Sequence, residues 1–311
     1  MSPEALALRA EFARRVRSGE AAEGAQQVAL LALHEAAEVA HAAFAAPWRI
    51  REVMDRMSNR RLSPGDPELD PAPPSPRAPL PVPDDLFEAF WAIIDGAGRG
   101  RSALEFTQAT AALGARLDPG FQAAQVALSL EWPGVAAAAA RGWPEPFTLR
   151  ALAAAPNGSL ACDFHRLIVE NGFDLEVLDR DALALRDLPP PLDYLNARIL
   201  QVHDLWHLVG GYRTTGLHEI AISAFQLAQF GHAYSGFVLA VTLASAASDP
   251  SRYAMLSGVI AAAWRHGRTS PPLLDVDWPA VWNLPVGEVR ARLGLEAFAS
   301  PWSADVFERV A

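Results

Sequence analysis

Two histidines and two carboxylates lie at positions from which they can share one metal ion. Residues 203–207 read HDLWH, and eleven further residues separate this motif from Glu219. Positions i and i+4 of a helix share a face, so His203 and His207 can present both imidazoles to one ion. Asp204 lies about 100° round the helix, where it can bind the same ion or hold an imidazole in its tautomer. Two nitrogens with one or two carboxylates suit zinc, and also iron, cobalt or manganese.

A helical hairpin is needed to bring Glu219 to the histidine pair. Gly210 and Gly211 predict the end of the first helix, and residues 212–216 predict a short loop. Glu219 then falls in the first turn of the next helix, where it can complete the site. This ligand set leaves a position for water or substrate, which is typical of a catalytic metal rather than a structural one. Histidine pairs at this spacing also occur on helices that hold no metal, so spacing alone leaves both interpretations open.

The elements that position these residues are all predicted to be helices. Apolar positions at helical spacing and turn signals predict helices over 24–46, 160–170, 192–209, 217–243 and 248–266. Ser159 is the expected N-cap of the second of these helices. The alternation that is typical of strands is absent. The predicted fold is therefore all-α, a compact multi-helix bundle with the metal site across a helical hairpin.

The chain divides into three parts by composition. Residues 1–62 form an alanine-rich N-terminal segment that is predicted to be helical. Residues 63–83 are dense in proline, which excludes helix interior and favours an extended linker or a strap across the surface. Residues 84–311 are predicted to form the helical metal-binding domain.

The composition excludes several classes of protein. The chain has 311 residues, of which 51% are hydrophobic, enough to bury a sizeable core. Its 26 basic and 36 acidic residues give a formal charge of −10, which argues against nucleic acid as a partner. The single cysteine, Cys162, excludes an intrachain disulfide and favours a reducing compartment. No signal peptide and no membrane-spanning helix are predicted, and binding to a membrane surface stays open.

The ligand pattern resembles that of a known family. An HDxxH motif followed by eleven residues and a glutamate is the signature of the coenzyme Q (ubiquinone) biosynthesis protein 4 family. Residues 194–208 resemble the metal-bearing helix of this family, and residues 215–220 resemble the start of its next helix. Segments 156–164 and 263–268 are also similar, and the resemblance extends in patches over 83–295. On this resemblance the chain is identified as a member of the family. The absence of a clean transit peptide and the composition rich in alanine, arginine and proline favour a bacterial member.

The resemblance implies a fold, a metal and a reaction. It implies an all-α protein and a divalent metal, usually zinc, with four ligands: His203, Asp204, His207 and Glu219. It also implies ubiquinone biosynthesis by action at C1 of a polyprenylated 4-hydroxybenzoate, where a carboxylate is lost and a hydroxyl takes its place. Zinc would serve a simple decarboxylation, whereas iron could also activate O₂ for the oxidative replacement.

The resemblance also implies partners and a location. The implied partners are a polyprenylated aromatic lipid, other quinone-biosynthesis proteins and a membrane surface, and a homodimer stays open. The expected location is the bacterial cytoplasm, peripherally at the inner membrane. Because the net charge is −10, docking on a membrane would depend on apolar side chains. Seven residues after the site can line a channel for the prenyl tail or simply form helix core: Phe225, Leu227, Phe230, Tyr234, Phe237, Val238 and Val241.

Three residues of the hairpin are candidates for catalytic roles beside the metal. Arg213 lies in the loop, where its guanidinium can pair with the carboxylate of the substrate. A solvated loop arginine is an equally good interpretation of Arg213. Tyr212 and His218 are candidate proton donors. His218 can equally be a surface residue near the start of a helix.

Two other functions compete with metal-dependent decarboxylation. The protein can be a non-enzymatic scaffold that binds a prenyl lipid and organises other quinone-biosynthesis proteins. The adjacent histidine and aspartate of the motif also resemble HD-type phosphohydrolases, in which His165 and Asp249 would supply further ligands. That interpretation leaves His207 and Glu219 without roles.

A second set of metal-ligand residue types lies in the N-terminal segment. His34, Glu38 and His41 share a helical face, and Glu38 with His41 forms half of a di-iron carboxylate motif. Such bundles need two copies of this half-motif and two more glutamates, and the sequence has no second ExxH. A polar stripe that faces solvent or a neighbouring helix is the favoured interpretation.

Overall fold

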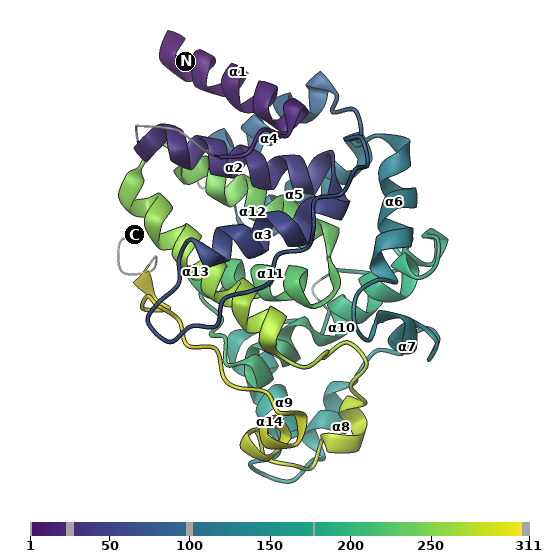
Figure 1. The fold of residues 1–311 in the computed structure, drawn as a ribbon. Helices are drawn as coiled ribbons and strands as arrows, with labels where there is room; N and C mark the ends of the chain where they lie inside the picture. Colours follow the sequence, from purple (N-terminus) through teal and green to yellow (C-terminus); the bar gives the residue numbers. More distant parts are fainter. Residues whose placement is uncertain (1, 23–27, 98–101, 177, 307–311) are drawn as a thin grey trace.

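The structure is a computed structural model that describes residues 2–22, 28–97, 102–176 and 178–306 (Figure 1). Within these ranges every regular element is a helix and none is a strand, which confirms the predicted all-α fold. The α-helices are α1 (Pro3–Ser18), α2 (Val28–Phe44), α3 (Ile50–Asn59), α4 (Asp84–Ala97), α5 (Ala103–Ala111), α6 (Pro119–Ser129), α7 (Val135–Ala139), α8 (Leu149–Ala153), α9 (Leu160–Asn171), α10 (Leu192–Gly210), α11 (Gly216–Phe230), α12 (Ala233–Ala246), α13 (Pro250–Thr269) and α14 (Val286–Leu293). The 3₁₀ helices are η1 (Pro47–Arg49), η2 (Ala112–Arg116), η3 (Leu185–Asp187) and η4 (Trp278–Val281).

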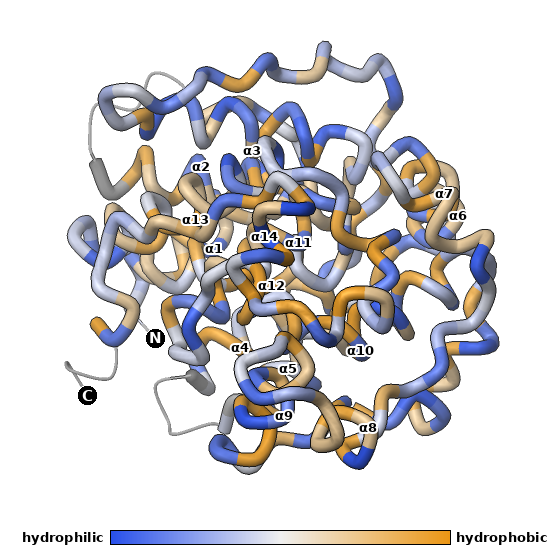
Figure 2. The backbone as a smooth tube through the Cα atoms, turned by 90° about the horizontal axis from the view of Figure 1, so that it is seen from below, coloured by the Kyte–Doolittle hydropathy of each residue, from blue (hydrophilic) through white to orange (hydrophobic). Residues whose placement is uncertain are grey.

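Helices α11 and α12 lie in the middle of the molecule and are covered by their neighbours (Figures 1 and 2). Helix α11 packs along α13, and α2 packs against both α12 and α1. Helix α12 carries no charged residue, which suits a helix that is covered on most sides. Gly236 lies where an added Cβ would be 3.5 Å from the Cβ of Ala43, so small residues let α12 and α2 approach closely.

One hydrophobic core runs through the N-terminal segment and the rest of the described chain. The ring of Phe90 on α4 lies 5.2 Å from that of Phe12 on α1 and 5.9 Å from that of Phe44 on α2. The ring of Phe44 in turn lies 5.3 Å from that of Phe237 on α12. The N-terminal helices therefore pack on the same core as the helices that carry the predicted site.

The proline-rich residues 63–83 contain no helix or strand and lie against α3 and α13 as a strap. The side chain of Asn59 makes two hydrogen bonds, of 2.7 and 2.9 Å, to the backbone of Leu69. Asp66 pairs with Arg265 of α13 at 3.0 Å. These contacts hold in place a segment whose prolines remove backbone donors.

The helices predicted around the site are confirmed in outline, with one correction. Helices α10 and α13 match the predictions over 192–209 and 248–266. The single helix predicted over 217–243 is wrong, because the chain breaks between α11 and α12 at Gly231, which has φ +69°. A Cβ at Gly231 would overlap the indole of Trp132, so the break allows that ring to approach the backbone. Because the residues on both sides of Gly231 are apolar, the hydrophobic periodicity of the sequence does not reveal the break.

Two further predictions concern helix ends and membrane spans. In the helix predicted over 24–46, the described part begins at Val28 and ends at Phe44, and residues 23–27 lie outside the described ranges. Ser159 caps α9 as predicted, because its hydroxyl accepts a hydrogen bond from the N–H of Cys162. No helix in the described parts of the chain combines the length and the hydrophobicity needed to cross a bilayer.

Candidate metal centre

The candidate site is built on the hairpin of α10 and α11. Helix α10 ends where Gly211 adopts a left-handed conformation with φ +78° and donates its N–H to the carbonyl of His207. Glycine reaches this conformation without the strain that a Cβ would add. After a short loop, Thr215 precedes α11 in extended conformation, and its carbonyl accepts the N–H of Glu219 at 2.9 Å. Glu219 therefore lies in the first turn of α11, as predicted.

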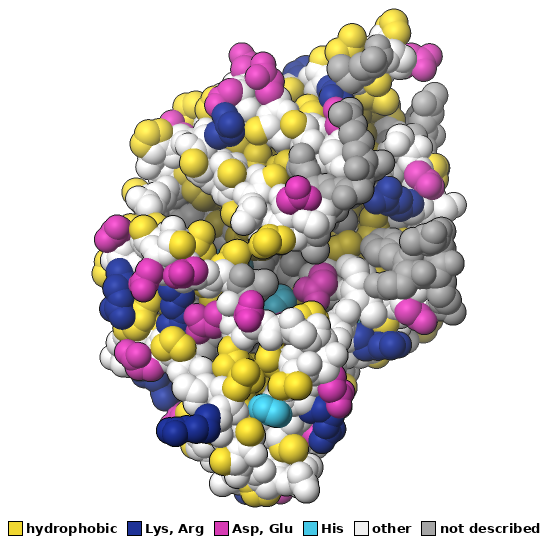
Figure 3. Space-filling view, turned by 180° about the vertical axis from the view of Figure 1, so that it is seen from behind, with side chains coloured by type: hydrophobic (Ala, Val, Ile, Leu, Met, Phe, Trp, Pro, Cys, Tyr) yellow, Lys and Arg dark blue, Asp and Glu magenta, His cyan; other side chains and the backbone are white. Residues whose placement is uncertain are grey.

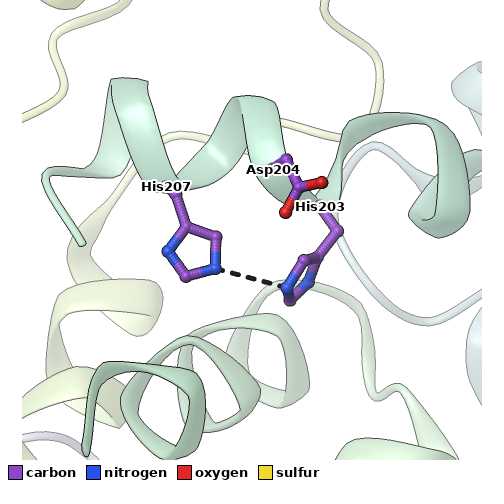
Figure 4. Close-up of side chains that lie close together, drawn as sticks. All are labelled: His203, Asp204 and His207. Atoms are coloured by element: carbon purple, nitrogen blue, oxygen red, sulfur yellow. Dashed lines mark hydrogen bonds between the residues drawn. The ribbon is translucent and has the colours of Figure 1, made fainter. Parts of the chain in front are cut away.

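The hairpin brings the four predicted ligands together. His203 and His207 project from one face of α10 with their Nε2 atoms 3.2 Å apart, and Asp204 lies beside them (Figure 4). Ligand atoms of these three residues all lie within 4.8 Å of one another. Glu219 reaches the pair from α11: its Oε2 atom is 3.3 Å from Nε2 of His203, and its Oε1 atom is 3.4 Å from Nε2 of His207.

These separations fit the ligand set of a divalent metal. A tetrahedral zinc site with ligand distances of about 2.0–2.1 Å keeps its ligand atoms about 3.3–3.4 Å apart. The 3.2 Å between the Nε2 atoms of His203 and His207 is close to the edge of such a tetrahedron. The Glu219 carboxylate approaches each imidazole with a different oxygen, at 3.3 and 3.4 Å. Asp204 can supply a fourth ligand or leave that position to water or substrate. Two imidazoles with carboxylates suit zinc, iron, cobalt and manganese.

The charges of the site depend on one another. Burial opposes ionisation of Glu219, but hydrogen bonds and positive charge from His203 and His207 outweigh it and hold its pKa well below the ordinary value. Burial alone would lower the pKa of His203, yet the Glu219 carboxylate outweighs burial and raises it. Burial raises the pKa of Asp204, which the two imidazoles offset only in part. The Glu219 carboxylate and the His203 imidazole thus stabilise each other's charged forms.

The site is open on one side. The side chain of His207 is 1% exposed, whereas those of His203 and Glu219 are 32% and 48% exposed. Seen from behind, the molecule shows a histidine beside acidic side chains within a recess of its surface (Figure 3). A buried ligand at the back and exposed ligands at the front are what a metal needs in order to meet a substrate.

A row of neutral side chains behind His203 was missed by sequence reasoning. A side-chain amide atom of Gln226 lies 2.7 Å from Nδ1 of His203, and the other amide atom lies 3.4 Å from the hydroxyl of Ser235. The Ser235 hydroxyl is in turn 3.0 Å from Nδ1 of His232. Gln226 follows Glu219 by seven residues, which is two helical turns, and that spacing was the signal that could have revealed it. Nδ1 of His207, in contrast, is buried without a hydrogen-bond partner among the described residues.

The three predicted catalytic residues lie around the loop, with different surroundings. The Tyr212 hydroxyl is 2.7 Å from Nδ1 of His266, and its ring stacks on Phe298. Nδ1 of His218 accepts the backbone N–H of Arg213 at 2.8 Å, which holds the loop in shape. The Arg213 side chain is exposed and has no ion-pair partner in the described parts of the chain. These contacts give Tyr212 and His218 structural roles, and the proton-donor roles stay predictions.

The residues invoked by two other interpretations lie elsewhere. His165 is on α9, and Asp249 caps α13 by accepting the N–H groups of Ser251 and Arg252. Neither belongs to the group of candidate ligands at residues 203–207. The residues considered for a prenyl channel are buried in the helix core except Tyr234, which is half-buried.

The family comparison covers the part of the chain that carries the site. Residues 145–299 match the family model described as coenzyme Q (ubiquinone) biosynthesis protein Coq4. This range contains α8 to α14 and therefore every predicted ligand and catalytic residue. Helices α1 to α7 precede it.

Curated relatives and a solved structure agree with this match. The chain is 33% identical over 126 residues to the mitochondrial ubiquinone biosynthesis protein COQ4 homolog of Drosophila ananassae, which is 39% of this chain and 46% of that protein. It is 27% identical over 157 residues to the Danio rerio homolog, which is 47% of this chain and 52% of that protein. The chain thus spans about half the length of the curated relatives it matches.

The fold is also found in a crystal structure from Nostoc punctiforme, of a protein assigned to ubiquinone biosynthesis. The TM-score is 0.51 at 24% identity, over 69% of this chain and 98% of that chain, and this likeness concerns the fold. The HDxxH–glutamate hairpin, the matched range and the curated relatives agree with one another. Through residues 145–299, the chain belongs to the coenzyme Q (ubiquinone) biosynthesis protein Coq4 family.

Proposed function

We propose that this protein acts in ubiquinone biosynthesis by removing the C1 carboxylate of a polyprenylated 4-hydroxybenzoate at a divalent metal. The metal would be held by His203, His207 and Glu219, with Asp204 beside them. The observation that carries the proposal is the set of separations of 3.2–3.4 Å among two imidazoles and a carboxylate that no arginine neutralises in the described structure. The family match supports a role in ubiquinone biosynthesis, and the substrate, the metal and the reaction belong to the proposal.

In this proposal the hairpin residues hold the metal and orient the substrate. A bound divalent metal supplies a Lewis acid that stabilises the negative charge left on the ring as CO₂ departs. Arg213, which is exposed at the loop, would pair with the substrate carboxylate and orient the ring. The bond from C1 to the carboxylate carbon breaks, CO₂ leaves, and C1 takes up one proton. An oxidative version would instead place a hydroxyl on C1. It would consume O₂ and water and release CO₂ and hydrogen peroxide, so that no separate reductant is needed.

The test begins with the metal content of protein purified without added metal. About one zinc or iron per chain is expected by mass spectrometry of the dissolved metal. Protein would then be incubated with prenylated 4-hydroxybenzoate that carries ¹³C in its carboxylate, with and without O₂. Release of ¹³CO₂ is expected, and the mass of the product separates replacement by hydrogen from replacement by hydroxyl.

Variants make this test specific to the hairpin. His203→Ala should lose both metal and ¹³CO₂ release, while His165→Ala, on α9 outside the site, should keep both. Wild-type protein that binds prenylated lipid but releases no ¹³CO₂ would contradict the decarboxylase and support the scaffold. Phosphate release from nucleotides by the wild type would instead favour the phosphohydrolase.

The proposal also places the protein at a membrane surface, because its substrate has a prenyl tail that partitions into lipid. With a net charge of −10, attraction to anionic headgroups would not drive binding, so apolar side chains would have to do so. Other quinone-biosynthesis proteins are the proposed protein partners. Co-flotation with neutral vesicles that contain the prenylated substrate tests the membrane part, and no flotation would contradict it.

A further inference from the structure

Four side chains form one hydrogen-bonded row that starts at a candidate metal ligand. The row runs from His203 on α10 through Gln226 on α11 and Ser235 on α12 to His232 at the start of α12, with separations of 2.7, 3.4 and 3.0 Å. Gln226 is 3% exposed and Ser235 is fully buried, so water cannot replace either contact. Burial and the charge of His203 lower the pKa of His232 to about 4, so its ring carries a single proton at neutral pH.

In one direction, every donor in the row points away from His232 and toward His203. Nδ1–H of His232 donates to the Ser235 hydroxyl, which donates to the Gln226 carbonyl. The Gln226 amide N–H then donates to Nδ1 of His203. His203 must then carry its proton on Nε2, which lies 3.3 Å from the Glu219 carboxylate and can donate to it. This direction suits the metal-free site when His203 carries a single proton, because Nε2 then holds that proton and cannot bind a cation.

The opposite direction uses the same contacts after the Gln226 amide turns by 180°. Oxygen and nitrogen of a glutamine amide occupy equivalent positions, so the turn changes no separation. Nδ1–H of His203 then donates to the Gln226 carbonyl, the amide N–H donates to Ser235, and the hydroxyl donates to Nδ1 of His232. The lone pair on Nε2 of His203 becomes available to a metal, and His232 carries its proton on Nε2. Each imidazole has one proton in both directions, so no net proton is lost within the row.

Mixed directions are disfavoured by the burial of Ser235. If Gln226 and His232 both donated to Ser235, its hydroxyl hydrogen would have no acceptor among the described residues. A buried donor without an acceptor is costly. The two ends of the row are therefore coupled, although His203 and His232 share no direct hydrogen bond in the described structure.

We propose that the row His203–Gln226–Ser235–His232 reverses its direction when a metal binds. Gln226 is then a positioning residue that presents the lone pair of His203, and metal binding moves the proton of His232 from Nδ1 to Nε2. The inference rests on the proposed metal site and assigns roles to Gln226, Ser235 and His232.

Metal affinity tests the role of Gln226. Zinc affinity would be measured by competition with a chromophoric chelator, on full-length folded protein. Gln226→Leu removes the acceptor for Nδ1–H and should weaken zinc binding by about 10- to 100-fold. Gln226→Glu keeps an acceptor and should bind zinc at least as tightly as the wild type.

Gln229 provides a matched control one turn along α11. Its amide bonds to the carbonyl of Gly267 at 2.8 Å and to the N–H of Leu273 at 2.9 Å, away from the row. Gln229→Leu should lower the melting temperature but leave zinc affinity within about twofold. If Gln226→Leu bound zinc as tightly as Gln229→Leu, the positioning role would be overturned.

The second readout is the tautomer of His232 with and without zinc. If Gln226 had only a structural role, zinc binding would not change this tautomer. Long-range ¹H–¹⁵N spectra distinguish a proton on Nδ1 from one on Nε2, and His232→Gln identifies the signal. In alkaline buffer, where His203 carries a single proton, the proton of His232 should lie on Nδ1 in metal-free protein and on Nε2 with zinc bound. The same tautomer in both states would overturn this inference while leaving the metal site intact. Wild-type protein that bound no zinc would overturn both.

Discussion

Two clusters of histidine and glutamate at helical spacing lie in different regions of this molecule. One is on α2, with His34, Glu35, Glu38 and His41, and the other is on the hairpin of α10 and α11. Both are rich in metal-ligand residue types, and they differ in what surrounds their carboxylates. That difference decides which cluster is a candidate metal site.

The carboxylates on α2 are already neutralised by arginine. Glu35 accepts hydrogen bonds from Arg60 and Arg61, which directly follow α3, and also from the hydroxyl of Tyr253 on α13. Glu38 pairs with Arg56 of α3. Guanidinium groups occupy the carboxylate oxygens that a cation would need. This cluster therefore joins α2, α3 and α13 as an ionic support of the fold.

The carboxylate at the hairpin meets imidazoles instead of guanidinium groups. Glu219 contacts His203 and His207, and no arginine pairs with it in the described structure. An imidazole can give up its proton near neutral pH and become a ligand, whereas a guanidinium cannot. The comparison teaches that spacing along one helix selects candidates, and the charge of residues from other helices selects among them.

The largest expected effect separates the clusters by metal content. His207→Ala removes a buried ligand from the hairpin and should reduce bound metal from about one per chain to none, as measured by mass spectrometry. Glu38→Gln, in the other cluster, should keep the full amount. Loss of metal from Glu38→Gln with an unchanged fold would break the comparison.

The next effect concerns stability, and here the α2 cluster should be more sensitive to substitution than the hairpin cluster. Glu35→Gln leaves the Arg61 guanidinium with a weaker partner and should lower the free energy of unfolding by about 3 kcal/mol in urea titrations. Glu219→Gln, whose side chain is 48% exposed, should change the stability of the metal-free protein by less than about 1 kcal/mol. Equal losses in the two variants would show that both clusters are structural.

The two clusters should also respond to pH in different ranges: the stability that depends on Glu35 in acid, and zinc binding by His203 at higher pH. Burial opposes ionisation of Glu35, but Arg61 and Tyr253 outweigh it, so the pKa of Glu35 is lower in the folded protein than the ordinary value of a glutamate. Its pairing stabilises the fold fully above that value, and the stabilisation is lost as pH falls through the lowered pKa. This loss should appear in thermal melts in acid, and it should be smaller in Glu35→Gln.

At the hairpin, protons compete with the metal for His203. Burial lowers the pKa of this imidazole, but Glu219 outweighs burial and raises it above the ordinary value of histidine. As pH falls, zinc affinity should therefore begin to weaken at a higher pH than an ordinary histidine ligand would give, well before the α2 cluster is affected. Zinc affinity that stayed constant between pH 8 and pH 6 would exclude His203 as a ligand.

The smallest effect concerns the arginine that pairs with neither cluster. Arg213 is exposed at the loop, so Arg213→Ala should change stability by less than about 0.5 kcal/mol and leave zinc affinity within about twofold. If Arg213 binds the substrate carboxylate, KM for the carboxylated lipid should rise, and Arg213→Lys should restore part of the loss. An unchanged KM in Arg213→Ala would show that Arg213 is a solvated loop residue that does not bind the substrate.

Much of the fold and of the site was predictable because it depends on neighbours along the chain. Helical periodicity, the Ser159 cap and the glycine pair at residues 210–211 are local signals, and the structure bears them out. The i, i+4 spacing places His203 and His207 on one face in any helix. Glu219 was predictable as well, because a short loop leaves few ways for the next helix to return.

Other features were decided by packing between distant segments. The break at Gly231 lets the indole of Trp132 pack against the backbone, a contact between segments far apart in the sequence. The carboxylates of the α2 cluster are paired with arginines that lie 18 to 26 residues away along the chain. The contact of Gln226 with His203 likewise depends on how α11 packs on α10. The amino-acid sequence was enough to predict most of the helices around the site and the candidate ligands that one hairpin brings together. Tertiary packing decided which carboxylates are neutralised, because opposite charges meet only after the chain has folded.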